Sequence, residues 1–201
     1  MDRIRVLLVT LSALIVLLPS ALAAQGGAAA DLKEIQAYQL TVPALKQVMV
    51  ATRNLLAAME TDPRYQRITK LEAELKRLED KDQPTAAESE RIEKIVTEME
   101  SIRSSVNIMG NNKSLSEIEA AAAKEPLVAN AFKAAGISAR DYAKFIGAFF
   151  QAATIHGMQK SGAIKEIPKD VNPANLKFVE EHAAEFEAFM KELEAFDRRL
   201  P

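Results

Sequence analysis

The sequence predicts an all-α protein, a mainly antiparallel helical bundle with a coiled-coil-like helical hairpin and a central apolar helix. Apolar residues recur every three or four positions along most of the chain, the spacing that places them on one face of a helix. Several of these segments begin with the capping residues and first-turn prolines that start helices. No segment alternates convincingly with the period of two that marks a half-buried strand, so we expect no sheet.

Residues 1–23 have the pattern of a secretory signal peptide. Arg3 and Arg5 precede an apolar run, and Ala21-Leu22-Ala23 has the small residues of a cleavage site. The apolar run, Val6 to Leu18, is too short to span a bilayer comfortably, and the alternative is an uncleaved membrane anchor. We therefore predict a periplasmic or secreted protein with no membrane span after signal cleavage.

The composition excludes several classes of function. The chain has 201 residues, no cysteine and a formal net charge of −2. Disulfides, thiol chemistry and cysteine-ligated metals are excluded, and the charge gives no electrostatic attraction for nucleic acid. After the signal peptide we expect a flexible tether over residues 24–30 and a single helical-bundle domain over residues 31–201.

Two helices are expected first in this domain. Asp31 with Glu34 offers a cap for a short helix. The next begins around Thr41 to Pro43, where proline suits the first turn, and runs to about Glu60. Its core-facing side consists of Leu45, Val48, Thr52, Leu55, Leu56 and Met59.

Residues 62–110 have the pattern of a helical hairpin. Asp62-Pro63 begins the first helix, Gln83-Pro84 ends it, and Thr85 with Glu88 forms a capping box for the second. Opposite net charges on the two helices favour an antiparallel pair. The apolar residues follow a three-four spacing typical of coiled-coil packing: Ile68, Leu71, Leu75 and Leu78, then Ile92, Ile95, Met99, Ile102, Val106 and Met109.

Two arrangements of this hairpin are open. Heptad hairpins in small proteins commonly pack internally, so we favour burial of both seams against each other and against the central helix. If the hairpin projects instead, a second apolar flank with Val96 is free for a partner helix or for a second copy of the chain.

Two short helices are expected between the hairpin and the central helix. Ser114 with Glu117 forms a capping box for the first, and Pro126 starts the second, which ends at Gly136.

The central helix is predicted to run from Ser138 to Gly162. Ser138 with Asp141 forms a capping box, and Gly162 can adopt the left-handed conformation that closes a helix. The apolar side consists of Tyr142, Phe145, Phe149, Ala152 and Ala153, and a narrow polar stripe consists of Arg140, Lys144, Gly147, Gln151 and Thr154. We therefore expect most of this helix to be buried.

The last helix is expected to start at Asn172-Pro173, after a connector over residues 163–171 that has no apolar period. We expect one helix along its whole apolar seam, which consists of Leu176, Val179, Ala183, Phe186, Met190 and Leu193.

His156 and His182 are the candidate metal ligands. Both fall on apolar sides of predicted helices, so they could be two core histidines hydrogen-bonded to neighbours, and His182 could also reach water at the edge of its stripe. The sharper alternative is a histidine pair that holds a metal, a haem or a small apolar ligand within the bundle. We favour the first interpretation, because neither histidine sits in a Glu-x-x-His motif, and Glu185 gives His182 only a reversed i, i+3 pair.

No enzyme class is indicated by the remaining motifs. The chain has no Gly-x-Ser-x-Gly motif and no glycine-rich phosphate loop, and most carboxylates lie beside lysine or arginine at helical spacing. We therefore expect no catalytic residues and assign no cofactor.

Three short segments carry a resemblance to other proteins: Leu40-Thr41 at a helix start, Gly136 to Tyr142 before the central helix, and Asn172 to Asn175 before the last helix. In these segments the chain resembles a loosely defined group of exported bacterial all-helical proteins of unknown function. The resemblance implies export and an all-helical fold, and it brings no activity.

The sequence therefore predicts an exported cell-envelope helical protein of the non-catalytic binding or adaptor type. Its expected partner is a protein, or a second copy of the chain, bound through helical surfaces. The alternative is a helical bundle that binds a metal, haem or small apolar ligand near His156 and His182.

Overall fold

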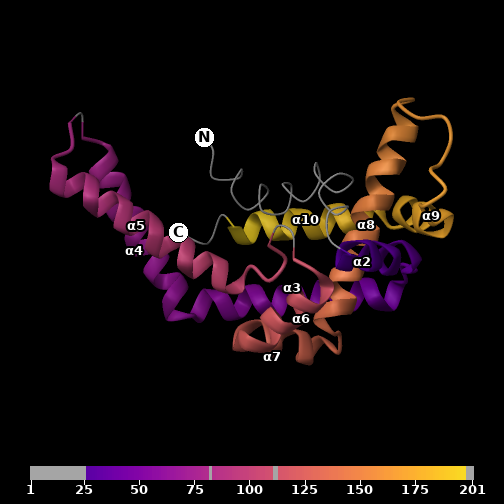
Figure 1. Cartoon of the computed structure of the whole chain (residues 1–201), viewed down its shortest axis with the longest axis horizontal. Coiled ribbons are helices and arrows are strands. Elements are labelled where there is room, and N and C mark those ends of the chain that lie inside the picture. Colours follow the sequence, from indigo (N-terminus) through magenta and orange to yellow (C-terminus); the bar gives the residue numbers. More distant parts are fainter. Residues whose placement is uncertain (1–25, 82, 111–112, 198–201) are drawn as a thin grey trace.

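The computed structural model describes residues 26–81, 83–110 and 113–197, and the predicted signal peptide lies outside this part of the chain. Over these ranges the chain forms helices and no strand, which confirms the all-α class (Figure 1). None of the described helices is both long and apolar enough to cross a membrane. The helices are α2 (Gly26–Ala37), α3 (Val42–Thr61), α4 (Pro63–Glu79), α5 (Ala86–Val106), α6 (Leu115–Lys124), α7 (Pro126–Ala135), α8 (Ala139–Lys160), α9 (Pro173–Glu181) and α10 (Ala183–Asp197).

The predicted capping residues start most of these helices. Thr41 caps α3, Asp62 caps α4, and the capping boxes expected at Thr85 and Ser114 are both formed. Gly136 ends α7 in the left-handed conformation, with φ of 68°. Helix boundaries were therefore predictable wherever a side chain satisfies the free backbone groups of a helix end.

Helix α8 lies at the centre of the main hydrophobic core, as predicted, but residues 153–160 include no buried residue, so the expected burial of most of the helix is wrong for its last two turns. Phe145 is fully buried, and Ala148 and Ala152 are 1% exposed. The same core includes Leu45 of α3, together with buried residues of α6, α7 and α9. These helices pack around α8 as a bundle.

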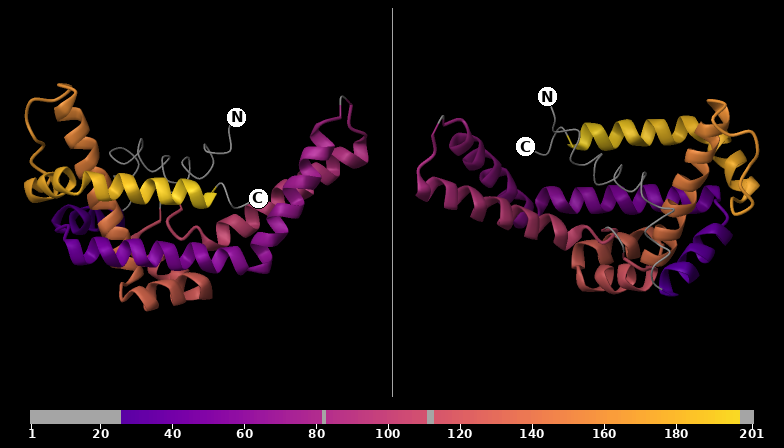
Figure 2. Two further views of the ribbon diagram at one scale, coloured as in Figure 1. Left: turned by 180° about the vertical axis from the view of Figure 1, so that it is seen from behind. Right: turned by 45° about the horizontal axis from the view of Figure 1, so that its top comes forward.

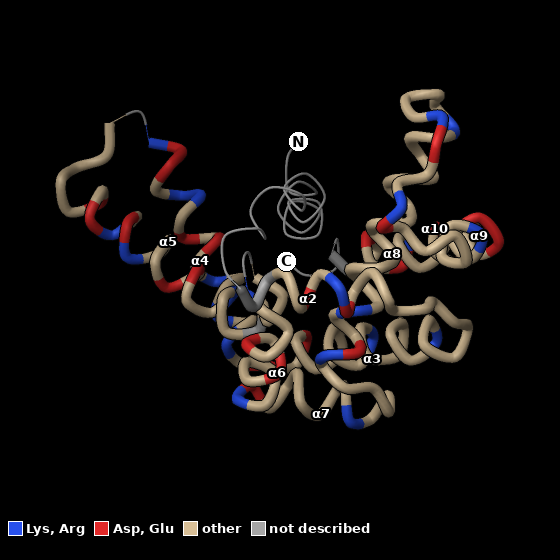
Figure 3. Tube along the Cα trace, turned by 45° about the vertical axis from the view of Figure 1, so that its right-hand side comes forward, with Lys and Arg blue, Asp and Glu red and all other residues tan. Residues whose placement is uncertain are grey.

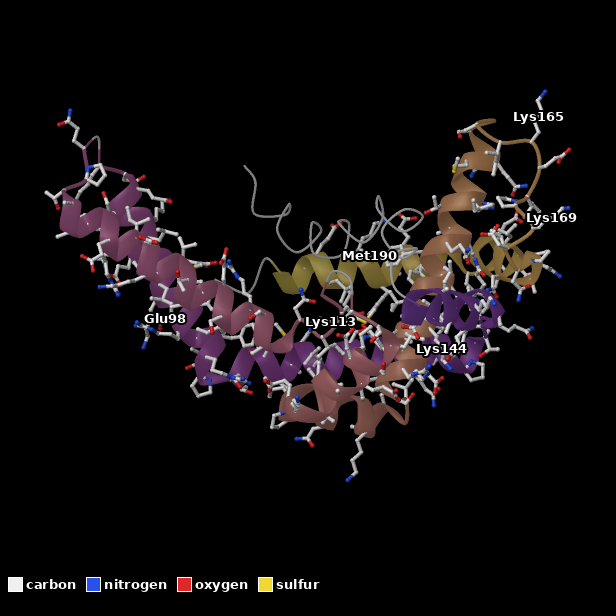
Figure 4. All side chains as sticks on the ribbon, in the orientation of Figure 1. Glu98, Lys113, Lys144, Lys165, Lys169 and Met190 are labelled. Atoms are coloured by element: carbon white, nitrogen blue, oxygen red, sulfur yellow. The ribbon has the colours of Figure 1, made fainter. Side chains whose placement is uncertain are left out.

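The first half of the narrow polar stripe of α8 contacts α2 and the residue after it, a contact that the sequence pattern does not predict. Arg140 pairs with Glu34 at 2.5 Å, and the ammonium of Lys144 lies 5.4 Å from the centre of the Tyr38 ring. Figure 4 shows Lys144 beside α2. This part of the stripe is therefore a helix contact, whereas Thr154 at its end is exposed.

Helix α2 begins at Gly26, so residues 26–30, for which a flexible tether was expected, are helical. The cap predicted at Asp31 is wrong. Asp31 lies within α2 and is buried, and its carboxylate accepts a hydrogen bond from the backbone N–H of Leu115 at 2.9 Å. The Asp31 carboxylate thus pairs with a free backbone N–H at the start of α6, and not with one at the start of α2.

The hairpin formed by α4 and α5 projects from the bundle, contrary to the internal packing that we favoured. Figures 1 and 2 show both helices extending away from the other helices on one side of the molecule. The hairpin has a hydrophobic core of its own, made of Ile68, Leu71, Ile95 and Met99, and separate from the core around α8. Leu75, Leu78 and Ile102 pack against this core, so these seam residues are buried between the two helices. Met109, the last residue of the predicted seam, packs instead against the core around α8.

The single last helix that we predicted is wrong, because the chain bends at His182 between α9 and α10. Beyond the bend, Phe186 stacks on Phe149 of α8 with ring centres 3.5 Å apart. Arg53 of α3 then forms two hydrogen bonds with Glu192, of 2.8 and 2.7 Å. No proline or glycine stands at residues 181–184, so tertiary contacts with α8 and α3 set the bend.

Candidate functional site

The two predicted metal ligands lie on different elements, and His182 makes its contacts with Glu185 and Phe178 rather than with His156. His182 is the residue at the bend, where its Nδ1 lies 2.7 Å from Glu185 Oε2 and its ring centre 4.4 Å from that of Phe178. His156 is partly buried in the last turns of α8. Within the described residues, no group of three histidine, cysteine, aspartate or glutamate side chains could hold a metal ion. A ligand shared by the two histidines stays a prediction.

The projecting hairpin provides the most distinct surface of the described residues. Three ion pairs connect its helices: Arg67 with Glu98 at 2.8 Å, Arg91 with Glu74 at 2.7 Å, and Arg103 with Glu72 at 2.8 Å. Figure 3 shows both signs of charge along α4 and α5, and Figure 4 shows Glu98 at the side of the hairpin. Arginine side chains hold the pKa values of Glu98 and Glu74 below their usual range.

The base of the hairpin is tied to the bundle by Arg64. Its guanidinium donates two hydrogen bonds of 2.9 Å to the carboxylate of Glu125 and two of 3.0 Å to that of Asp62. Glu125 also caps α7 by accepting from the backbone N–H of Leu127. One arginine therefore connects the start of α4 to the start of α7 and fixes the hairpin where it leaves the bundle.

The outward side of α5 carries a stripe made of Glu93, Val96 and Glu100, which we call the α5 stripe. All three residues are exposed, and Val96 is one of only four large hydrophobic residues that are exposed in the described chain. Their spacing of three and four places them in one row along the helix. The neighbouring surface of α5 is an open depression lined by Glu90, Glu93, Lys94, Thr97, Glu98, Ser101 and Ile102.

The outward side of α4 carries a matching row of opposite charge, made of Lys70, Ala73 and Arg77. These three residues are exposed and have the same spacing of three and four. The hairpin therefore presents an acidic row on one helix and a basic row on the other, each with a small apolar residue at its centre.

A second exposed region, which the sequence pattern does not predict, lies at the end of α8 and in the connector after it. Residues 153–170 include no buried residue, and Met158 and Ile167 in this region are two of the four exposed large hydrophobic residues of the described chain. The connector after α8 has no apolar period, so no pattern in the sequence marked it.

Comparison with known proteins gives no independent assignment. No protein-family model, no curated protein and no solved structure matches this chain.

Proposed function

We propose that this protein is an exported cell-envelope protein of the non-catalytic binding or adaptor type, and that the α4–α5 hairpin is its binding arm. The observation that carries the proposal is the separate hydrophobic core of the hairpin, whose buried members are Ile68, Leu71, Ile95 and Met99. A helix pair that buries its own seams keeps its outward faces available for another molecule.

The anchoring of the hairpin supports a role as a rigid arm. The hydrogen bonds of Arg64 hold its base, and the ion pairs between α4 and α5 hold the two helices in register. A surface that keeps its shape before binding loses less conformational entropy when a partner docks.

The α5 stripe determines the kind of partner that fits. Glu93 and Glu100 stand one heptad apart and form no ion pair with other described residues, and Val96 lies between them. A partner helix that places basic residues one heptad apart, with a small apolar residue between them, would satisfy both carboxylates and cover Val96. We therefore propose a basic helical segment of an envelope protein as the partner of α5.

Site-specific photo-crosslinking tests this function. A photoreactive amino acid is placed at Val96 and, as the control, at Val50 of α3, because both valines are 39% exposed. After irradiation of intact cells, we expect a discrete crosslinked species from position 96 and none from position 50, and mass spectrometry identifies the second component.

The same experiment separates the alternatives. A species with twice the mass of the chain identifies the partner as a second copy. Loss of the species in an E93K/E100K background supports recognition through the two carboxylates. No species from position 96, or equal species from both positions, contradicts the proposal.

A further inference from the structure

The last turn of α8 and the loop after it, residues 158–169, protrude from the bundle, and we call this segment the α8 tip. The last buried residue of α8 is Ala152 and the next buried residue along the chain is Val171. Figures 1 and 2 show this end of α8 standing beyond α9 and α10. The fold therefore leaves the α8 tip outside its core, at the other end of the molecule from the hairpin.

The α8 tip exposes apolar side chains that packing does not explain. Met158 is 38% exposed and Ile167 is 40% exposed, whereas the other two exposed large hydrophobic residues lie on α3 and α5. Ile164 is partly buried, and its backbone N–H donates to the carbonyl oxygen of Met158 at 3.3 Å, so the loop folds back on the end of the helix.

The charged residues of the α8 tip are mostly basic. Lys160, Lys165 and Lys169 are exposed and form no ion pair with any described residue, and Glu166 is the single carboxylate among them. Figure 4 shows Lys165 and Lys169 extending away from the ribbon. The neighbouring Asp170 accepts a hydrogen bond of 3.3 Å from Gln36 of α2, so it is held by the bundle.

We propose that the α8 tip docks onto a lipid surface with anionic headgroups. Lysine can lay its methylene stem along apolar surface while its ammonium meets a phosphate, and Met158 and Ile167 offer short apolar insertions between the lysines. A specific protein interface buries roughly 1,200 Å² or more over both partners around a packed apolar patch, whereas the α8 tip exposes only Met158 and Ile167 as large apolar side chains. A bilayer, in contrast, is bound by the sum of a few lysines and a few apolar side chains.

Vesicle flotation tests the proposal. The protein is recovered from the cell envelope, and mass spectrometry of the intact protein identifies its N-terminal residue. The vesicles are phosphatidylcholine alone and phosphatidylcholine with phosphatidylglycerol, at about 0.1 M salt, where charges are screened beyond about 10 Å. We expect binding only to the anionic vesicles. Each lysine should contribute about fivefold, the equivalent of about 1 kcal/mol, so loss of the three lysines alone should weaken binding by roughly a hundredfold. K160E/K165E/K169E also adds three negative charges and should weaken binding by at least this factor.

Matched variants distinguish binding through the α8 tip from a general effect of the protein's charge or of its exposed apolar residues. K46E/K124E/K133E changes three exposed lysines elsewhere by the same total charge, and V50S removes a valine that is exposed to the same degree as Ile167. We expect I167S to weaken binding severalfold and V50S to leave it unchanged. K165E/K169E changes only the loop and keeps the test valid if K160E disturbs the end of α8.

Three results would overturn the proposal: no binding to anionic vesicles, equal binding to both kinds of vesicle, or equal loss in the tip and control variants. None of these outcomes depends on the hairpin, so the proposal stands or falls separately from the binding arm.

Discussion

Gly147 and Ile35 approach each other so closely that a β-carbon at position 147 would lie 2.9 Å from Cγ2 of Ile35. This contact joins α2 to the polar stripe of α8. The crowded atom is a branch of a stiff side chain, so it cannot easily move aside. The glycine is therefore the residue that lets the two helices touch.

We expect Gly147→Ala to destabilise the protein. Overpacking lowers the free energy of unfolding by about 1–3 kcal/mol. The higher helix propensity of alanine raises it by at most about 1 kcal/mol. In an Ile35→Ala background the crowding is absent, so the same change should stabilise. Urea unfolding of the unchanged protein, the two single variants and the double variant measures the coupling free energy between positions 147 and 35. Additive changes in the free energy of unfolding would contradict the contact.

The hairpin should unfold without the bundle. Leu71→Ala removes a fully buried side chain from the hairpin core, at a cost of about 2–5 kcal/mol. Hydrogen exchange should then accelerate in α4 and α5 and stay unchanged in α7 and α8. The control is Leu45→Ala, in the main core, which should accelerate exchange in the bundle. Uniform acceleration by Leu71→Ala would show that the two cores are one cooperative unit.

Asn175 should be a large stability determinant although it is polar. It is 3% exposed, its Oδ1 accepts from Leu40 N–H at 2.9 Å, and its Nδ2 donates to the Tyr38 carbonyl at 2.8 Å. Asn175→Ala leaves two backbone groups unpaired, at about 1–3 kcal/mol each. Thermal unfolding compares this variant with Asn130→Ala, an exposed change that should have almost no effect. Equal midpoints of the bundle transition in the two variants would contradict the role of Asn175.

Two tyrosines should respond in opposite ways to loss of their hydroxyl groups. The Tyr65 hydroxyl is buried without a hydrogen-bond partner in the described structure, and burial raises its pKa to about 12. The Tyr142 hydroxyl lies 3.0 Å from Thr52 Oγ1. We expect Tyr65→Phe to maintain or raise the free energy of unfolding and Tyr142→Phe to lower it by about 1 kcal/mol. Denaturant titration of both variants checks the difference, and a clear loss with Tyr65→Phe would reveal a missed partner.

The base of the hairpin should weaken in acid. Hydrogen bonds from Arg64 hold the pKa of Glu125 below its ordinary 4.5 and that of Asp62 below 3.8. The folded protein therefore binds fewer protons than the unfolded chain, so this stabilisation is complete above the ordinary values and is lost as the pH falls through the lowered ones.

Glu125→Gln tests this dependence. It should cost about 1–3 kcal/mol near neutral pH, and the difference from the unchanged protein should shrink in urea titrations below about pH 4. The control is Glu60→Gln, an exposed carboxylate that forms no ion pair with the described residues. A difference that is independent of pH would contradict the lowered pKa.

Local features of the fold were predictable because their causes are local. The caps at Thr85 and Ser114 and the left-handed Gly136 each satisfy backbone groups within a few residues, so the sequence around them is sufficient. The apolar side of α8 was predictable for the same reason, since helical spacing alone defines a face.

The features that the sequence did not predict depend on distant partners. From the local sequence, Arg140 is indistinguishable from a solvent-exposed residue, because its partner Glu34 lies 106 positions away in the chain. The bend at His182 follows from contacts of Phe186 and Glu192 with other helices. The three-four seams of the hairpin are equally compatible with internal packing and with projection, so only the structure distinguishes them. Val96 could be marked as a free flank from the sequence, whereas the α8 tip could not.

The two separate cores also determine how the protein melts. A chain with one shared core unfolds in a single step, and its calorimetric and van't Hoff enthalpies agree. Here the hairpin and the bundle each bury their own apolar side chains, and they are joined at Arg64 and at Ile108, which follows α5 and is buried in the core of the bundle. Heat should therefore release the hairpin first, the calorimetric enthalpy should exceed the van't Hoff value, and no single melting temperature describes the molecule.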